Sequence, residues 1–251
     1  GYYRRQHSGV LMRFTIVPYT GTSVDGLAVT AGFQPEAVFI QRRTSTRNFT
    51  CKTSAMTGAN AHVHAGTFAG NRITITTTGI TLGTDTDVNA NTVTYYAIFL
   101  GADTNLGVGS YTGTGGAHSE NAVATTGAAA GITIVIRDGG VISGWIARYG
   151  DQTGDNSQGM LSLQLKTTNL ITAQSLTAFS VGTSSQVNLL GDTYYFLHLN
   201  TATNNVFQDK YTGDAADNRD IAAADPFLPT WVHVKHTGSA SLQGCHNPSG
   251  T

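Results

Sequence analysis

The chain has 251 residues, of which 40% are apolar and only 12% charged, and its 14 basic and 15 acidic residues leave a formal net charge of -1. This balance excludes the strongly basic surface with which proteins bind nucleic acid or an anionic membrane. No apolar run reaches the roughly 18 residues that a membrane-spanning helix needs, so membrane insertion is not expected either.

The residue types favour strands over helices. The chain contains 38 threonines and 30 glycines. Threonine is β-branched and fits a pleated, half-buried surface, while glycine is common in turns. No segment shows a helical period, and the apolar content is high enough to bury a core. The composition therefore predicts an all-β protein.

Alternating apolar and polar residues predict a series of short strands. One face of each strand is expected to lie in a core and the other to be more exposed. Clusters of Gly, Asn, Asp and Ser between these segments are typical of turns. In chain order, the predicted strands are 11–17, 37–41, 72–78, 93–100, 132–136, 141–147, 161–165, 193–199 and 231–235.

A tandem repeat is the strongest pattern in the sequence. The tripeptide Tyr-Thr-Gly begins at Tyr19, Tyr111 and Tyr211. The spacing Gly-x5-Asn-x5-Tyr-Tyr occurs at 83–96 and again at 182–195, ahead of the second and third tripeptides. Shared spacing over such a stretch indicates duplication of a unit of about 95 residues, a length that suits a jelly-roll- or Ig-like β-sandwich.

Two further segments fit the same repeat. Phe-x-Pro at 33–35 and at 227–229 leads into a strand in each case. Cys51 and Cys245 each lie 12 residues after the centre of that strand, so we expect equivalent sites in two copies and not a bonded pair.

The second copy lacks Phe-x-Pro. When its apolar residues are aligned with those of the first copy, Ile134 is equivalent to Val38 and Ile136 to Ile40. The repeat then divides the chain into four parts. These are the end of a preceding repeat or an N-terminal arm (1–18), a first β-sandwich repeat (19–107), a second (108–207) and a partial third (208–251).

The repeated unit resembles β-rich domains that recur in tail, fibre and other virion proteins of tailed bacteriophages. The first copy departs from their pattern at Glu36, Ala37 and Gln41, and the second lacks the aromatic residue of the central strand. These motifs are structural and not catalytic. The resemblance therefore implies an architectural role in a virion, with copies of the chain as partners and, by analogy, a trimer. The residues that carry it are Tyr211-Thr212-Gly213, Asn218-Arg219, Phe227, Pro229, 231–235, Gly182, Asn188 and Thr193-Tyr194-Tyr195.

Two segments have the spacing of metal ligands. His62 and His64 lie on one side of an extended segment, and trimeric phage fibre tips hold iron with such pairs. No third ligand is evident, so we expect exposed strand histidines and no metal. Oxygen-bearing residues alternate at 85–91 as in a calcium loop, but Ala90 and Tyr96 replace the required Gly and Glu. A turn with Asx hydrogen bonds is the better interpretation, and no cofactor is predicted.

The candidate ligand-binding residues are basic or aromatic. Arg42 and Arg43 open the densest basic patch, which suits either the solvated end of a strand or a contact with another subunit or an anionic glycan. Trp145, Tyr149 and Trp231 could stack on sugar rings, although burial in a core or between subunits is the commoner fate of such side chains.

Nothing in the sequence indicates an enzyme. His118, Ser119 and Glu120 lie in a segment that we expect to be a polar loop, and adjacent residues cannot by themselves form a nucleophile, a base and an oxyanion site. The motifs of hydrolases, zinc proteases and phosphate-binding loops are absent from the sequence.

Two functional hypotheses follow from these patterns. The first is a non-enzymatic virion structural protein, a tail or fibre component or a capsid decoration, assembled in the host cytoplasm with itself and other virion proteins. The second is a receptor-binding module that recognises a host-surface glycan. A cellular surface adhesin is disfavoured because no secretory signal is present at the start of the sequence.

Overall fold

The computed structural model describes residues 13–43, 49–64, 68–122, 124, 126–139, 145–160, 166–201, 206–215, 221, 231–235 and 243–246. Strands dominate this part of the chain, and the two helices in it span four residues each. The predicted all-β class is confirmed. The strand predicted at 161–165 lies outside the described residues, and the one predicted at 141–147 is described only from residue 145 onward.

Residues 13–101, which we call the first half, form two antiparallel sheets and a short helix. The larger sheet has the strand order β1-β9-β3-β4-β5-β6, and the smaller has the order β2-β8-β7. The elements are β1 Phe14–Thr20, β2 Leu27–Thr30, β3 Pro35–Arg42, β4 Thr50–Thr53, β5 Ala61–Val63, β6 Phe68–Ala69, β7 Ile73–Thr76, β8 Gly79–Leu82, α1 Thr86–Asn89 and β9 Thr94–Gly101.

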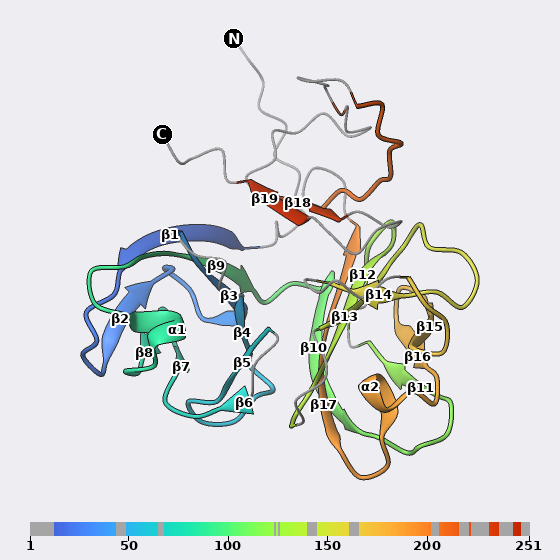
Figure 1. The fold of residues 1–251 in the computed structure, drawn as a ribbon, viewed down its shortest axis with the longest axis horizontal. Helices are drawn as coiled ribbons and strands as arrows, with labels where there is room; N and C mark the ends of the chain where they lie inside the picture. The colour runs from blue at the N-terminus through green and yellow to red at the C-terminus, as the bar shows by residue number, and fades with distance from the viewer. Residues whose placement is uncertain are drawn as a thin grey trace.

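Residues 106–201, the second half, also form a larger sheet, β10-β17-β12-β13-β14, and a smaller one, β11-β16-β15. A separate hairpin, β18 Val232–Lys235 with β19 Gln243–His246, follows later in the chain. Figure 1 shows the first half at the left, the second at the right and the hairpin above them. The elements of the second half are β10 Leu106–Thr112, β11 His118–Asn121, β12 Ala129–Arg137, β13 Ile146–Tyr149, β14 Gln158–Gly159, β15 Ile171–Gln174, β16 Ala178–Val181, α2 Ser185–Asn188 and β17 Thr193–Thr201.

The two halves repeat the same tyrosine contacts. Tyr19 stacks on Tyr95 with ring centroids 5.2 Å apart, and its hydroxyl donates to the carbonyl oxygen of Val88. Tyr111 stacks in the same way on Tyr194 at 5.1 Å, and its hydroxyl donates to the carbonyl of residue 187. In each half, the tyrosine of Tyr-Thr-Gly therefore links the first strand to the short helix through its hydroxyl group.

The hydrogen-bond register corrects the alignment of the two halves by one residue. In the first half, Ile40 pairs with Ala97 of β9. The position equivalent to Ala97 in the second half is Phe196 of β17, and it pairs with Val135. Ile40 is therefore equivalent to Val135 and not to Ile136. Each strand also has a register shift at its start, between Pro35 and Ala37 in β3 and between 130 and 132 in β12. The sequence could not fix the register because residues on both faces of these strands are apolar.

Each larger sheet is buried on both faces, and this overturns the expectation of one exposed face. In β3, Val38 and Ile40 face the core of the first half, while Ala37 and Phe39 face the second half. In β12, Val135 faces the core of the second half, whereas its neighbours 134 and 136 face the first half. The order of layers is therefore small sheet, large sheet, large sheet, small sheet.

Candidate functional site

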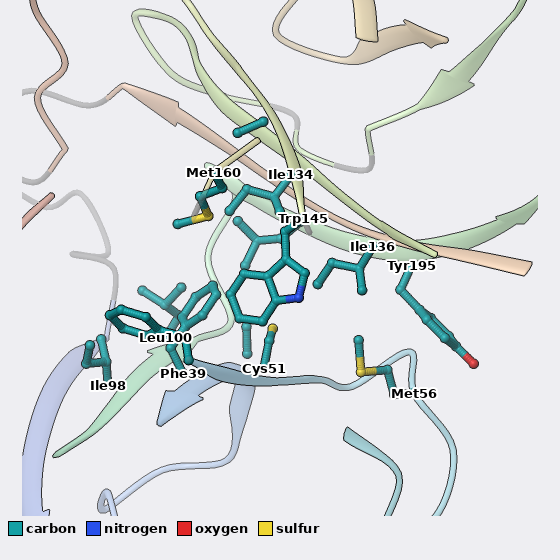
Figure 2. Close-up of a cluster of buried hydrophobic side chains, with 14 of the residues drawn as sticks. Phe39, Cys51, Met56, Ile98, Leu100, Ile134, Ile136, Trp145, Met160 and Tyr195 are labelled. Atoms are coloured by element: carbon teal, nitrogen blue, oxygen red, sulfur yellow. The ribbon is translucent and has the colours of Figure 1, made fainter. Parts of the chain in front are cut away.

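The two halves meet in a cluster of buried side chains to which both contribute. We call it the joint core, and Figure 2 shows its side chains converging from both larger sheets. Cys51 in it is a free thiol whose pKa is raised by burial, so it behaves as a small apolar side chain. The joint core consists of Ala37, Phe39, Phe49, Cys51, Met56, Ile98, Leu100, Leu106, Ile134, Ile136, Trp145, Ala147, Met160, Tyr195 and Leu197.

Trp145 lies at the centre of the joint core and is fully buried. Its indole Nε1 donates a hydrogen bond to Nδ1 of His62 at 2.9 Å. The ring of His64 packs edge-on against the indole at 5.8 Å between centroids, and Phe39 lies 5.7 Å away on the same basis. Trp145 therefore uses both its apolar ring and its single polar group within the fold, and no face of it is open to a sugar ring.

The expectation that His62 and His64 are exposed is wrong, since their exposed fractions are 3% and 2%. The two side chains lie two positions apart on an extended segment, so they point to the same side, and that side is covered by Trp145. Within the described ranges, no three His, Cys, Asp or Glu side chains come close enough together to hold a metal ion. Because Nδ1 of His62 accepts the indole N–H, this pair serves the contact between the halves.

Acid is expected to weaken this contact. Burial, with smaller contributions from His64 and Arg72, lowers the pKa of His62 from 6.5 to about 4. Above pH 6.5 the imidazole is neutral in both the folded and unfolded chain, and between pH 6.5 and 4 only the unfolded chain gains the proton. The free energy of unfolding should therefore fall as the pH drops, by about 3 kcal/mol in total for this residue.

Urea unfolding at pH values from 7.5 to 4.5 measures this loss. Burial also lowers the pKa of His198, so the control must isolate His62. His62→Asn provides it, because its Oδ1 can accept the Trp145 N–H without taking up a proton. The prediction fails if wild type and His62→Asn lose stability in parallel across this range.

The other predicted aromatic residues lie at the edge of the joint core. Tyr149 is half-buried at the end of β13 and packs against the joint core. Trp231 is also half-buried, stacks on His233 with ring centroids 6.0 Å apart, and packs against the same set. The structure thus brings the three candidate aromatics together in one apolar contact between segments far apart in the sequence.

The segment with calcium-loop spacing, 85–91, contains the whole of α1. Asp85 is the N-cap, its Oδ1 accepts a hydrogen bond from the backbone N of Asp87, and its other oxygen binds the buried Arg72 at 2.9 Å. This confirms the predicted Asx interaction. Asn89, the last residue of α1, is fully buried and binds three backbone groups, and Asn188, at the same place in the second half, is fully buried and binds four.

His118, Ser119 and Glu120 lie on strand β11, which corrects the expectation of a loop. His118 Nε2 lies 2.8 Å from a Glu120 oxygen, whereas Ser119 points to the other side of the strand and bonds to Ser180. The hydroxyl of Thr114 is 3.1 Å from His118 Nδ1, but it donates to the carbonyl of Gly116 within its own turn. These contacts brace the turn that precedes β11.

Arg42 and Arg43 lie apart from the aromatic cluster, at the end of β3. Arg42 is half-buried, Arg43 is exposed, and neither has a hydrogen bond or ion pair from its side chain to any residue that the structure describes. The Nε atom of Arg42 is itself buried without an acceptor. The second half differs at this point, because the matching Arg137 binds Asp192 through Nε and a terminal nitrogen, both at 2.6 Å.

The first half has Val93 where the second has Asp192. Backbone bonds fix this equivalence, since Gly21 N donates to the carbonyl of Val93 and Gly113 N donates to that of Asp192, both at 2.8 Å. Arg42 thus occupies the place of a paired arginine but lacks the carboxylate that its counterpart binds.

Introducing that carboxylate with Val93→Asp is expected to create an ion pair with Arg42. Val93 also packs against the core of the first half, so the substitution alone loses apolar contact. A double-mutant cycle with Arg42→Gln removes that loss, and we expect a favourable coupling of about 1 kcal/mol, the range of a partly exposed pair. The matched cycle of Arg137→Gln with Asp192→Asn gives the native reference. Zero coupling in the first cycle and a clear value in the second would contradict the equivalence.

Comparison of the chain with protein-family models, with curated proteins and with solved structures gives no match. In the part of the chain that the structure describes, no helix is long and apolar enough to cross a membrane.

Proposed function

We propose that the protein is a non-enzymatic structural component of a tailed-bacteriophage virion, located in the tail or fibre apparatus or decorating the capsid. The observation that carries this proposal is the joint core. Because each larger sheet is covered on both faces, bending at the contact would expose apolar side chains to water. The two halves therefore form a stiff unit, which suits a part that bears load or fixes spacing.

The repeated contacts support a chain built from tandem β-sandwich copies of about 95 residues. Strand order, the stacked tyrosines and the buried asparagine that ends each short helix correspond between the halves. The hairpin adds one further parallel, since Cys245 lies opposite His233 as Cys51 lies opposite Phe39. We therefore propose that residues 208–251 belong to a partial third copy.

The near-neutral surface suits assembly with other copies and with other virion proteins in the host cytoplasm. With only 12% charged residues, contacts between copies bury few charges that would need a partner. A trimer is proposed by analogy with the phage proteins that the repeat resembles.

Two measurements test the proposal. Mass spectrometry of purified virions from the source of the sequence should find the chain in stoichiometric amounts, and cryo-electron microscopy of the recombinant protein should show a closed oligomer. Threefold symmetry would support a fibre or decoration role, whereas sixfold neighbours would indicate a tube or capsid. Absence from virions together with a monomer at all concentrations would refute the proposal.

A glycan-binding, receptor-recognising module is the second candidate. Arg42 and Arg43 favour it, because two adjacent guanidinium groups at the end of a strand, one half-buried and one exposed, suit an acidic sugar. A glycan array with the whole chain, compared with Arg42→Gln/Arg43→Gln, decides between them: binding that this variant loses supports recognition.

A further inference from the structure

Equivalent positions in the two halves carry opposite charges at the ends of β3 and β12. Arg43 N donates to the carbonyl of Thr94, and Asp138 N donates to that of Thr193, so Arg43 and Asp138 occupy the same place in the two sheets. We call Arg42 with Arg43, at the end of β3, the basic end. We call Asp138 with the pair Arg137–Asp192, at the end of β12, the acidic end.

The two ends differ in how far the fold satisfies them. At the acidic end, Arg137 is neutralised by Asp192, which leaves the charge of Asp138. Asp138 is half-buried, and the hydroxyl of Tyr195 donates to it at 3.3 Å. At the basic end, two guanidinium groups have no acidic partner among the described residues, and one of them contains a buried Nε without an acceptor. Arg43 is exposed at this end, so its guanidinium is open to a carboxylate supplied from outside, and such a charge-assisted pair would be favourable there.

We propose that the basic end of one chain binds the acidic end of a second copy, head to tail. This inference rests on the proposed assembly function and adds to it the surfaces that meet. The occupant is argued from charge complementarity, since the first half of each chain presents two positive groups at the position where the second half presents a net negative one. Because the two surfaces are different, the contact is heterologous, and repetition of it closes a ring when the rotation allows.

Charge reversal with the full chain tests the contact. Arg42→Glu/Arg43→Glu gives a chain with two acidic ends, and Asp138→Lys gives a chain with two basic ends. Each variant alone should self-associate about tenfold more weakly than wild type in low salt, as measured by sedimentation equilibrium. An equimolar mixture of the two should recover association, because each chain then offers the end that the other lacks.

Matched controls reverse exposed charges elsewhere, with Lys166→Glu on the second half and Asp25→Lys on the first. They should change association by less than about twofold, since isolated surface charges contribute little. Circular dichroism melts establish that every variant is folded.

The outcomes separate the contact from the proposed function. If wild type associates but the reversal variants associate equally well, or their mixture recovers nothing, the contact is overturned while assembly stands. If wild type stays a monomer at every concentration, the contact is overturned, and the proposed function is overturned with it only when the chain is also absent from purified virions. Binding of an acidic oligosaccharide that depends on Arg42 and Arg43, without self-association, would overturn the contact and assign the basic end to a glycan.

Discussion

Replacing Trp145 with alanine is expected to lower the free energy of unfolding by about 4 kcal/mol, the middle of the range for a buried aromatic side chain. The indole is fully buried between the halves, and its removal leaves a cavity that neither sheet can fill alone. It also leaves Nδ1 of His62 without its donor. We further expect the single unfolding transition to split in two, because the halves lose their largest shared side chain.

Urea unfolding followed by circular dichroism measures both effects. Trp145→Phe is the graded control, because it keeps an aromatic ring in the core but loses the N–H and part of the ring volume, so its destabilisation should be about half as large. Trp231→Ala removes the other tryptophan, which is only partly buried at the edge of the joint core, and should cost less than about 2 kcal/mol. A loss below 1 kcal/mol for Trp145→Ala in one cooperative transition would show that the halves are held by other contacts.

Asn188→Asp is expected to cost about 3 to 5 kcal/mol, and Asn89→Asp the same amount in the first half. The amide nitrogen of Asn188 donates to the carbonyls of Gly116 and Gly182, both at 2.7 Å, and its oxygen accepts from Thr114 N. Aspartate has nearly the same shape but would place a carboxylate against two carbonyl oxygens in a fully buried site.

Chemical unfolding of the two single variants measures this cost. Asn91→Asp is the control, because Asn91 is exposed close to the first site and its substitution should change stability by less than about 0.5 kcal/mol. Similar stabilities for Asn91→Asp and Asn188→Asp would mean that the buried amide is not a structural centre of the fold.

The repeated spacing was the part of the site that sequence alone could predict, and its contacts explain why. In Gly-x5-Asn-x5-Tyr-Tyr, the glycine carbonyl accepts from the asparagine amide, and a Cβ at Gly83 would overlap the backbone of Asn71. The hydroxyl of Tyr95 accepts from Ala90 N and donates to the carbonyl of residue 86, so it closes α1. These bonds are local and directional, and they therefore leave a fixed spacing in the sequence.

The joint core could not be predicted, because periodicity within one strand does not show what covers its second face. Phe39 and Ile134 were predicted as residues of ordinary strands, and their packing against each other's sheets depends on the arrangement of both halves. The burial of His62 was hidden for the same reason. A histidine on a short strand is expected to be exposed to solvent. Only the three-dimensional structure shows that a tryptophan 83 positions away covers His62 and donates a hydrogen bond to it.

The two-sided burial of the larger sheets has a consequence for biosynthesis. The last strand of the first half ends at Gly101, but the buried side chains that cover its outer face extend as far along the chain as Leu197. At ordinary translation rates the ribosome needs roughly 5 to 20 seconds to make the intervening segment. For that time the nascent chain presents a completed sheet with Phe39, Ile98 and Leu100 uncovered, a surface that chaperones bind and that favours aggregation when synthesis stalls.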